Sequence, residues 1–118
     1  MNLDSNKEWE NQFGSKTKAY DFEEREIHKG DYGNSNSAYG WDFDHILPEA
    51  HGGTTVATNI QIANIKTNRE KADRTTFISE NGKTYQVRRR ARTPKNKWAG
   101  GYDYSKKKYC MVENKDEN

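Results

Sequence analysis

The chain has 118 residues, of which 31% are hydrophobic and 32% are charged. That length predicts one domain over residues 1–118 and excludes a second sizeable hydrophobic core. A single cysteine excludes an internal disulfide and a zinc site built on paired cysteines. No apolar run is long enough to cross a membrane and the polar N-terminus has no hydrophobic signal segment, so we expect a cytoplasmic protein.

The net charge is only +2, but the charged residues are distributed unevenly. Residues 1–43 carry a net charge of −4, whereas residues 81–108 contain ten basic side chains and one acidic side chain. A basic block of this kind is typical of a surface that contacts nucleic acid. A solvated surface rich in lysine and arginine would have the same composition, so both interpretations stay open at this point.

The N-terminal third contains apolar residues without a decisive period. Between residues 9 and 29 their spacing fits either a short helix or a short hairpin that turns around Phe22–Arg25. Residues 30–40 then contain several glycines, asparagines and serines, which are typical of turns. We therefore expect N-terminal turns ahead of the main folded module.

The central segment predicts the order strand, long loop, strand, helix. Residues 39–47 have the composition of a strand, which Pro48 should end because proline cannot donate a hydrogen bond to a sheet. Residues 49–58 contain two adjacent glycines and predict a loop. The sequence Asn-Ile-Gln-Ile at 59–62 predicts a second strand, and residues 63–73 have a fair helical composition.

The C-terminal third predicts a hairpin followed by a basic extension. Residues 76–87 alternate around Asn81-Gly82, which is the strongest short signal for a hairpin turn. The basic extension covers about residues 83–108. The predicted fold class is therefore α+β: a small ββα finger, with a core module at about residues 39–75, N-terminal turns and a C-terminal hairpin.

Four side chains of the central segment have the chemistry that phosphodiester hydrolysis needs, namely a base for water and a cation for the charge on the phosphate. Asp44 supplies an anionic oxygen, the ligand that hard cations such as Mg²⁺ prefer. His45 is the side-chain type that accepts a proton near neutral pH. Asn68 offers a carbonyl oxygen as a second, neutral ligand, and Asn59 can brace the loop that aims the histidine.

These residues resemble the motif of the HNH endonucleases, whose site is a ββα module that holds one metal ion. Asp44-His45 matches the family's metal ligand and general base, Asn59 its central asparagine, and Asn68 its final metal ligand. Further positions agree over residues 32–73, about a third of the chain: Lys71, Pro48 in a DHIxP motif, Gly52-Gly53, and a Tyr32–Trp41 approach similar to that of phage-type members. The spacings from His45 to Asn59 and from Asn59 to Asn68 resemble those in the HNH domains of RNA-guided CRISPR nucleases.

The resemblance implies a DNA endonuclease that leaves 5′-phosphate and 3′-hydroxyl ends. Asparagine rather than histidine at position 68 favours Mg²⁺ or Mn²⁺ over Zn²⁺. The paired cysteines of many relatives are missing, with Asn64 and Thr67 at those positions. Packing, and not zinc, must therefore hold the predicted helix.

Several assignments near the site keep an alternative. Asn64 lies one turn before Asn68 on the same predicted helical face and competes with it as a ligand, although we favour Asn68. Asp42 shares a strand face with Asp44 and is a weaker rival. Asp73 marks the end of the matching segment and has no assigned role.

The expected partner is DNA, most simply double-stranded, and a homodimer is compatible with the sequence. Lys71 either reaches the scissile phosphate or is an exposed helix lysine. Trp98, Tyr102 and Tyr104 either stack on DNA or belong to the core. The predicted DNA contacts are Arg69, Lys71, Arg74, Arg88, Arg89, Arg90 and Arg92.

Two other functions compete with the nuclease interpretation. The first is a catalytically inactive DNA-binding module that keeps the ββα finger as a scaffold. The second is a protein-interaction domain in which the Asp-His pair is incidental. The presence of Asp44, His45, Asn59 and Asn68 together favours the nuclease.

Overall fold

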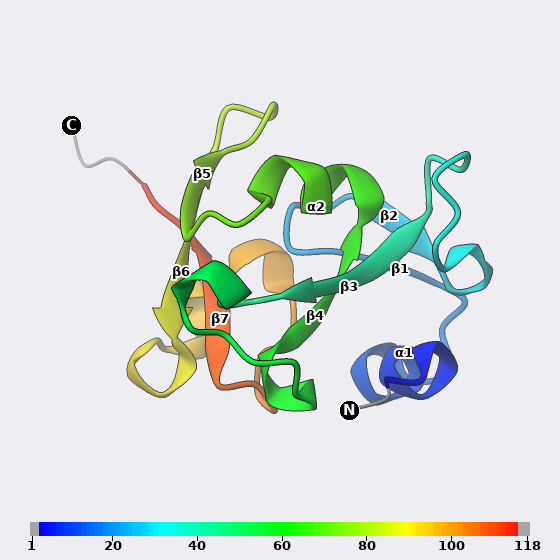
Figure 1. Ribbon diagram of the computed structural model, residues 1–118, viewed down its shortest axis with the longest axis horizontal. Coiled ribbons are helices and arrows are strands. Elements are labelled where there is room, and N and C mark those ends of the chain that lie inside the picture. Colours follow the sequence, from blue (N-terminus) through cyan, green and yellow to red (C-terminus); the bar gives the residue numbers. More distant parts are fainter. Residues whose placement is uncertain (1–2, 116–118) are drawn as a thin grey trace.

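A computed structural model describes residues 3–115 of the chain, and its N-terminal part contains a helix followed by a hairpin (Figure 1). Helix α1 spans Ser5–Phe13 and begins where the Asp4 carboxylate accepts a hydrogen bond from the backbone of the helix. Strands β1 (Lys18–Tyr20) and β2 (Glu26–His28) then pair antiparallel. The helix and the hairpin, which were alternatives for residues 9–29, therefore both form, one after the other.

The predicted ββα module occupies the middle of the chain. Strand β3 (Trp41–His45) pairs antiparallel with β4 (Ile60–Asn64), and this register places Asp44 opposite Gln61. Helix α2 (Ile65–Lys71) follows β4 directly and packs against both strands (Figure 1). The helix is shorter than residues 63–73 because β4 continues to Asn64, and because Ala72 adopts a positive φ of 49°.

The C-terminal part forms a three-stranded antiparallel sheet in the order β5-β6-β7. Strands β5 (Thr76–Ile78) and β6 (Thr84–Arg89) make the predicted hairpin, with Gly82 at a φ of 85° in its turn. Strand β7 (Tyr109–Glu113) was not predicted and pairs with β6. The basic residues between β6 and β7 therefore belong to a connection within one sheet, and not to an appended extension.

The structure confirms the α+β class: a compact domain of two helices and three small antiparallel sheets within residues 3–115. No helix of this part of the chain is long and apolar enough to cross a membrane.

Aromatic side chains build much of the two hydrophobic clusters of the core. Trp9 of α1 packs on Trp41 of β3 with ring centroids 5.3 Å apart, and this contact attaches the N-terminal helix to the ββα module. Tyr102 and Tyr104 are only 4% and 0% exposed. For these two residues, stacking on DNA is therefore wrong and a place in the core is correct. Trp98 is half-buried against the same cluster.

A group of charged side chains, in which Glu23 is buried and Arg25 and Glu70 are partly buried, links the first hairpin to α2 and to the residue after β5. Arg25 contacts Glu70 at 2.6 Å and Glu23 at 3.2 Å, and Ser79 donates to Glu23 at 2.5 Å. Burial raises the pKa of Glu23 to about 7, against the hydrogen bond from Ser79 and the charge of Arg25. Burial acts to raise the pKa of Glu70 as well, but the hydrogen bond with Arg25 outweighs this effect and holds the pKa at about 2.

This arrangement predicts that stability falls as the pH rises from 4.5 to about 7, because the folded state then binds more protons at Glu23 than the unfolded state does. Glu23→Gln should reduce that slope and raise Tm at pH 8 by about 5 °C. Thermal unfolding followed by circular dichroism between pH 5 and 8 measures both. Glu24→Gln, at an exposed neighbour, is the control and should keep the wild-type slope. An unchanged slope in Glu23→Gln would contradict the prediction.

Candidate active site

A pocket of about 210 Å³ lies at the end of β3, beside the last turn of α2. Asp44 and His45 reach it from the strand, and Asn68 reaches it from the helix. Three of the four residues singled out from the sequence therefore line one cavity. The remaining lining residues are Phe43, Pro48, Glu49, Ala50, Ala72 and Asp73.

The Asp44 carboxylate is held from two sides. It is only 5% exposed; Gln61 Nε2 donates to its Oδ2 at 2.9 Å, and Lys71 Nζ lies 3.1 Å from the same oxygen. Burial raises the pKa of Asp44, and the charge of Lys71 opposes that effect. Within residues 3–115 the hydrogen bonds and ion pairs of this carboxylate fall on Oδ2, which leaves Oδ1 for a ligand in the pocket.

His45 is oriented through both its ring and its backbone. Its Nε2 lies 2.7 Å from the hydroxyl oxygen of Thr55, in the loop between β3 and β4. Its carbonyl oxygen accepts a hydrogen bond from Lys71 Nζ at 2.6 Å. If Nε2 carries the proton and donates to Thr55, the ring lone pair lies on Nδ1, which can then accept a proton.

Asn59 closes the loop that carries Thr55. Its buried amide accepts from Leu47 N at 2.9 Å and donates to Leu47 O at 3.0 Å and to Thr54 O at 2.9 Å. Gly53 passes so close that a Cβ there would lie 1.7 Å from Leu47 O, so this position requires glycine. The asparagine thus contacts backbone, and the paired glycines let the loop pack against it.

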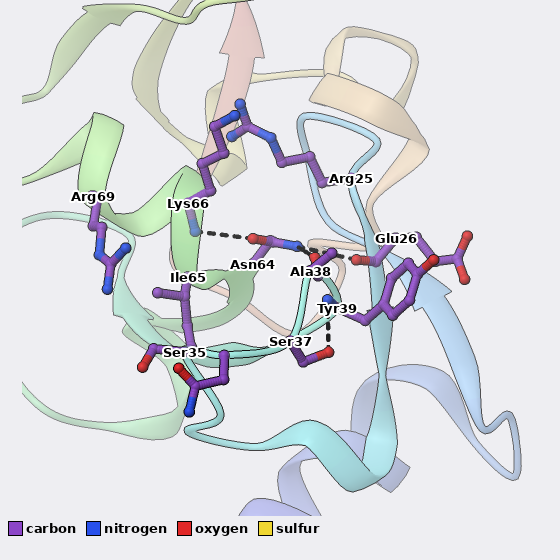
Figure 2. Close-up of a pocket in the computed structure, with 11 residues that line it drawn as sticks. Arg25, Glu26, Ser35, Ser37, Ala38, Tyr39, Asn64, Ile65, Lys66 and Arg69 are labelled. Carbon is purple, nitrogen blue, oxygen red and sulfur yellow. Dashed lines mark hydrogen bonds between the residues drawn. The ribbon is translucent and has the colours of Figure 1, made fainter.

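The geometry separates Asn68 from its rivals. Asn68 Nδ2 donates to Phe43 O at 3.3 Å, so its Oδ1 is the atom available to a cation. The Asn64 amide instead donates to Ala38 O and Glu26 O and accepts from Lys66 N, in a different pocket on the N-terminal side of α2 (Figure 2). Asp42 is exposed and does not line the Asp44 pocket.

Asn64 and Thr67, which stand where many HNH relatives have cysteines, hold α2 by hydrogen bonds. Besides its side-chain contacts, Asn64 donates its backbone N–H to Asp21 Oδ2 at 3.0 Å. Thr67 is fully buried and accepts from the Arg25 guanidinium at 2.9 Å. Polar contacts to the first hairpin therefore hold the helix together with its packing against β3, β4 and β5.

The prediction for Lys71 is wrong in both of its forms. The side chain is 0% exposed, so it neither contacts DNA directly nor projects from the helix into solvent. Its ammonium group is occupied by Asp44 and by the His45 carbonyl. The position of Lys71 on the helix does not by itself reveal this burial, because whether its side chain reaches β3 depends on how α2 packs against that strand.

The other predicted DNA contacts lie at the surface. Arg69, Arg74, Arg88, Arg89 and Arg92 are exposed, and Arg90 is half-buried with its Nε donating to Lys107 O. Four cations gather at a groove of about 630 Å³ formed by β6, β7 and the connection between them: Arg88, Arg89, Arg92 and Lys97. The structure therefore concentrates part of the basic block on one surface.

The residues of the pocket fit a hard divalent cation, with one restriction. Asp44 offers a carboxylate oxygen and Asn68 an amide oxygen, and Glu49 and Asp73 add negative charge at the rim. Within the described part of the chain, no three His, Cys, Asp or Glu side chains group closely enough to hold a metal ion. A bound cation would therefore depend on Asn68 and on oxygens from water or substrate.

No protein-family model, curated protein or solved structure matches this chain significantly.

The sequence did not reveal three side chains that support the residues of the pocket without lining it. Thr55 orients the histidine ring, Gln61 contacts Asp44, and the Tyr104 hydroxyl contacts Gln61. Gln61 carried a usable signal, because a polar residue inside an otherwise apolar strand needs a buried partner. Thr55 and Tyr104 carried none, since their contacts depend on loop closure and on the placement of the C-terminal segment.

We expect Lys71→Met to destabilise the fold by about 3–5 kcal/mol, because it leaves the buried Asp44 carboxylate without its counter-charge. Lys66→Met is the matched control on the same helix. The Lys66 side chain is 59% exposed and pairs with Glu80, so its loss should cost less than about 1 kcal/mol. Urea unfolding of the two variants measures the difference between their free energies of unfolding. Equal destabilisation would show that the Lys71–Asp44 ion pair does not stabilise the fold as predicted.

Proposed function

We propose that this protein is a divalent-metal-dependent endonuclease that hydrolyses DNA phosphodiester bonds. The observation that carries the proposal is the convergence of Asp44, His45 and Asn68 on one pocket, with Asn59 closing the loop beside it. The resemblance of these residues to the HNH motif supports the same chemistry. The basic groove formed by β6 and β7 supports an anionic substrate.

His45 is the proposed general base. It would take a proton from the attacking water, and the contact of its Nε2 with Thr55 would keep the ring aimed at that water. The hydrogen bond from Lys71 to the His45 carbonyl holds the backbone at the same point. Preorganisation of this kind removes the cost of orienting the base during the reaction.

Asp44 Oδ1 and Asn68 Oδ1 are the proposed protein ligands of the metal. When bound, a divalent cation would stabilise the charge that develops on the scissile phosphate and on the departing 3′ oxygen. Asp44 would stay in place through its contacts with Gln61 and Lys71, and Asn68 through its contact with Phe43 O.

Replacing the base tests the reaction. His45→Ala should lower the rate of supercoiled-plasmid nicking in Mg²⁺ or Mn²⁺ by at least about 100-fold, the usual contribution of a general base. EDTA should abolish nicking by the wild type. His28→Ala, which changes a half-exposed histidine outside the pocket, should nick at the wild-type rate. Nicking by His45→Ala at the wild-type rate would show that another residue is the base.

Salt dependence tests the basic groove. The double variant Arg89→Gln/Arg92→Gln should bind duplex DNA more weakly, and the slope of log K against log salt should fall by about 2, since each phosphate contact contributes about 0.9. Lys16→Gln/Lys18→Gln makes the same charge change at exposed positions near the first hairpin. Fluorescence anisotropy at several salt concentrations measures both slopes, and an equal reduction in the control would count against a role for the groove.

A further inference from the structure

A chain of buried polar groups runs from the pocket into the hydrophobic core. The Tyr104 hydroxyl donates to Gln61 Oε1, and Gln61 Nε2 donates to Asp44 Oδ2 at 2.9 Å. Tyr104, Gln61 and Asp44 are 0%, 1% and 5% exposed. Solvent therefore contributes little to these contacts, and each group depends on the next one for its hydrogen bond.

The direction of this chain is set at both of its ends. A primary amide has one donor end and one acceptor end, and a carboxylate can only accept. Burial raises the pKa of Tyr104 well above its ordinary value, so the hydroxyl keeps the proton that it donates. Because that proton is directed at Gln61 Oε1, the NH₂ end of the amide must face Asp44. Without this hydroxyl, Gln61 Oε1 loses its hydrogen-bond donor, and the amide is held at one end only, by its contact with Asp44.

We infer that Gln61 and Tyr104 are positioning residues of the proposed site. Together with Lys71 they hold Oδ2 of Asp44, and this leaves Oδ1 available as a metal ligand in the pocket that Asp44 lines. The inference rests on the proposed function for the role of Asp44, but its first test is metal binding, which can be measured without DNA cleavage. It assigns a role at the site to a tyrosine that is 60 residues away from Asp44 in the sequence.

Tyr102 provides a matched comparison. Its ring lies 4.6 Å from that of Tyr104, it is also buried, and its hydroxyl accepts a hydrogen bond within the core. Its partner, however, is the backbone N–H of Ile62 at 3.0 Å, with no contact to Gln61 or Asp44 among the hydrogen bonds of the described residues. Removing either hydroxyl is the same small chemical change, so a purely structural effect should appear in both variants.

The test measures Mn²⁺ binding by electron paramagnetic resonance, with MnCl₂ as the only added ligand. Tyr104→Phe should weaken Mn²⁺ affinity by about tenfold, the lower end of the effect of residues that orient metal ligands. Tyr102→Phe should keep the wild-type affinity, while both variants have a lower Tm. Equal affinity in Tyr104→Phe and the wild type, or equal loss in both variants, would overturn the inference.

A double-mutant cycle tests whether Tyr104 acts through Gln61. Gln61→Met removes the donor to Asp44 and should weaken Mn²⁺ binding by itself. Adding Tyr104→Phe to it should then cause no further loss, whereas additive losses would overturn the proposed connection. Absence of Mn²⁺ binding by the wild type would overturn it as well.

Plasmid nicking separates this inference from the proposed function. A wild type that binds Mn²⁺ with the expected variant pattern but does not nick DNA would support the positioning role and contradict the nuclease. A wild type that nicks DNA, with Tyr104→Phe equal to it in both nicking and Mn²⁺ affinity, would support the nuclease and contradict the positioning role.

Discussion

The buried ammonium group of Lys71 is the contact on which the central module depends. It joins the last turn of α2 to Asp44 Oδ2 at 3.1 Å and to the His45 carbonyl at 2.6 Å, and the side chain is completely buried. An unpaired charge at this depth is costly, so the helix and β3 can adopt their places only together. The same contact that attaches the helix also fixes the two residues at the end of the strand, and this couples the fold of the module to the geometry of its pocket.

Hydrogen bonds complete what the ion pair begins. Asn64 and Thr67 attach the other end of α2 to the first hairpin, and Asn59 closes the long loop against Leu47. Each of these polar side chains is buried and satisfied by backbone or charged partners, which gives it a single geometry and not several. A module of this size has few apolar side chains to specify its packing, so these directional contacts determine how the loop, strand and helix meet.

The C-terminal part of the chain supports the pocket indirectly, through the contact of Tyr104 with Gln61. Strand β7 pairs with β6, and the segment before β7 carries Tyr102 and Tyr104, whose hydroxyl groups form hydrogen bonds with Ile62 and Gln61 of β4. The connection that carries the basic residues therefore runs between two paired strands. Two cations of this connection and two of β6 line one groove. The cations proposed to bind substrate and the tyrosine that contacts Gln61 thus come from one stretch of chain, with the arginines exposed and the tyrosines buried in the core.

The sequence by itself determined the ββα order, the hairpin at Asn81-Gly82 and the residues that meet in the pocket, because these depend on local spacing, on proline and glycine, and on side-chain chemistry. It also indicated both N-terminal elements without deciding between them. Only the tertiary structure decided the burial of Lys71, the pairing of β7 and the contacts of Thr55, Gln61 and Tyr104. These features join segments far apart in the chain, and a contact between distant segments leaves no period or motif in either one. The physical role of such a side chain is therefore set by the partner that folding brings to it.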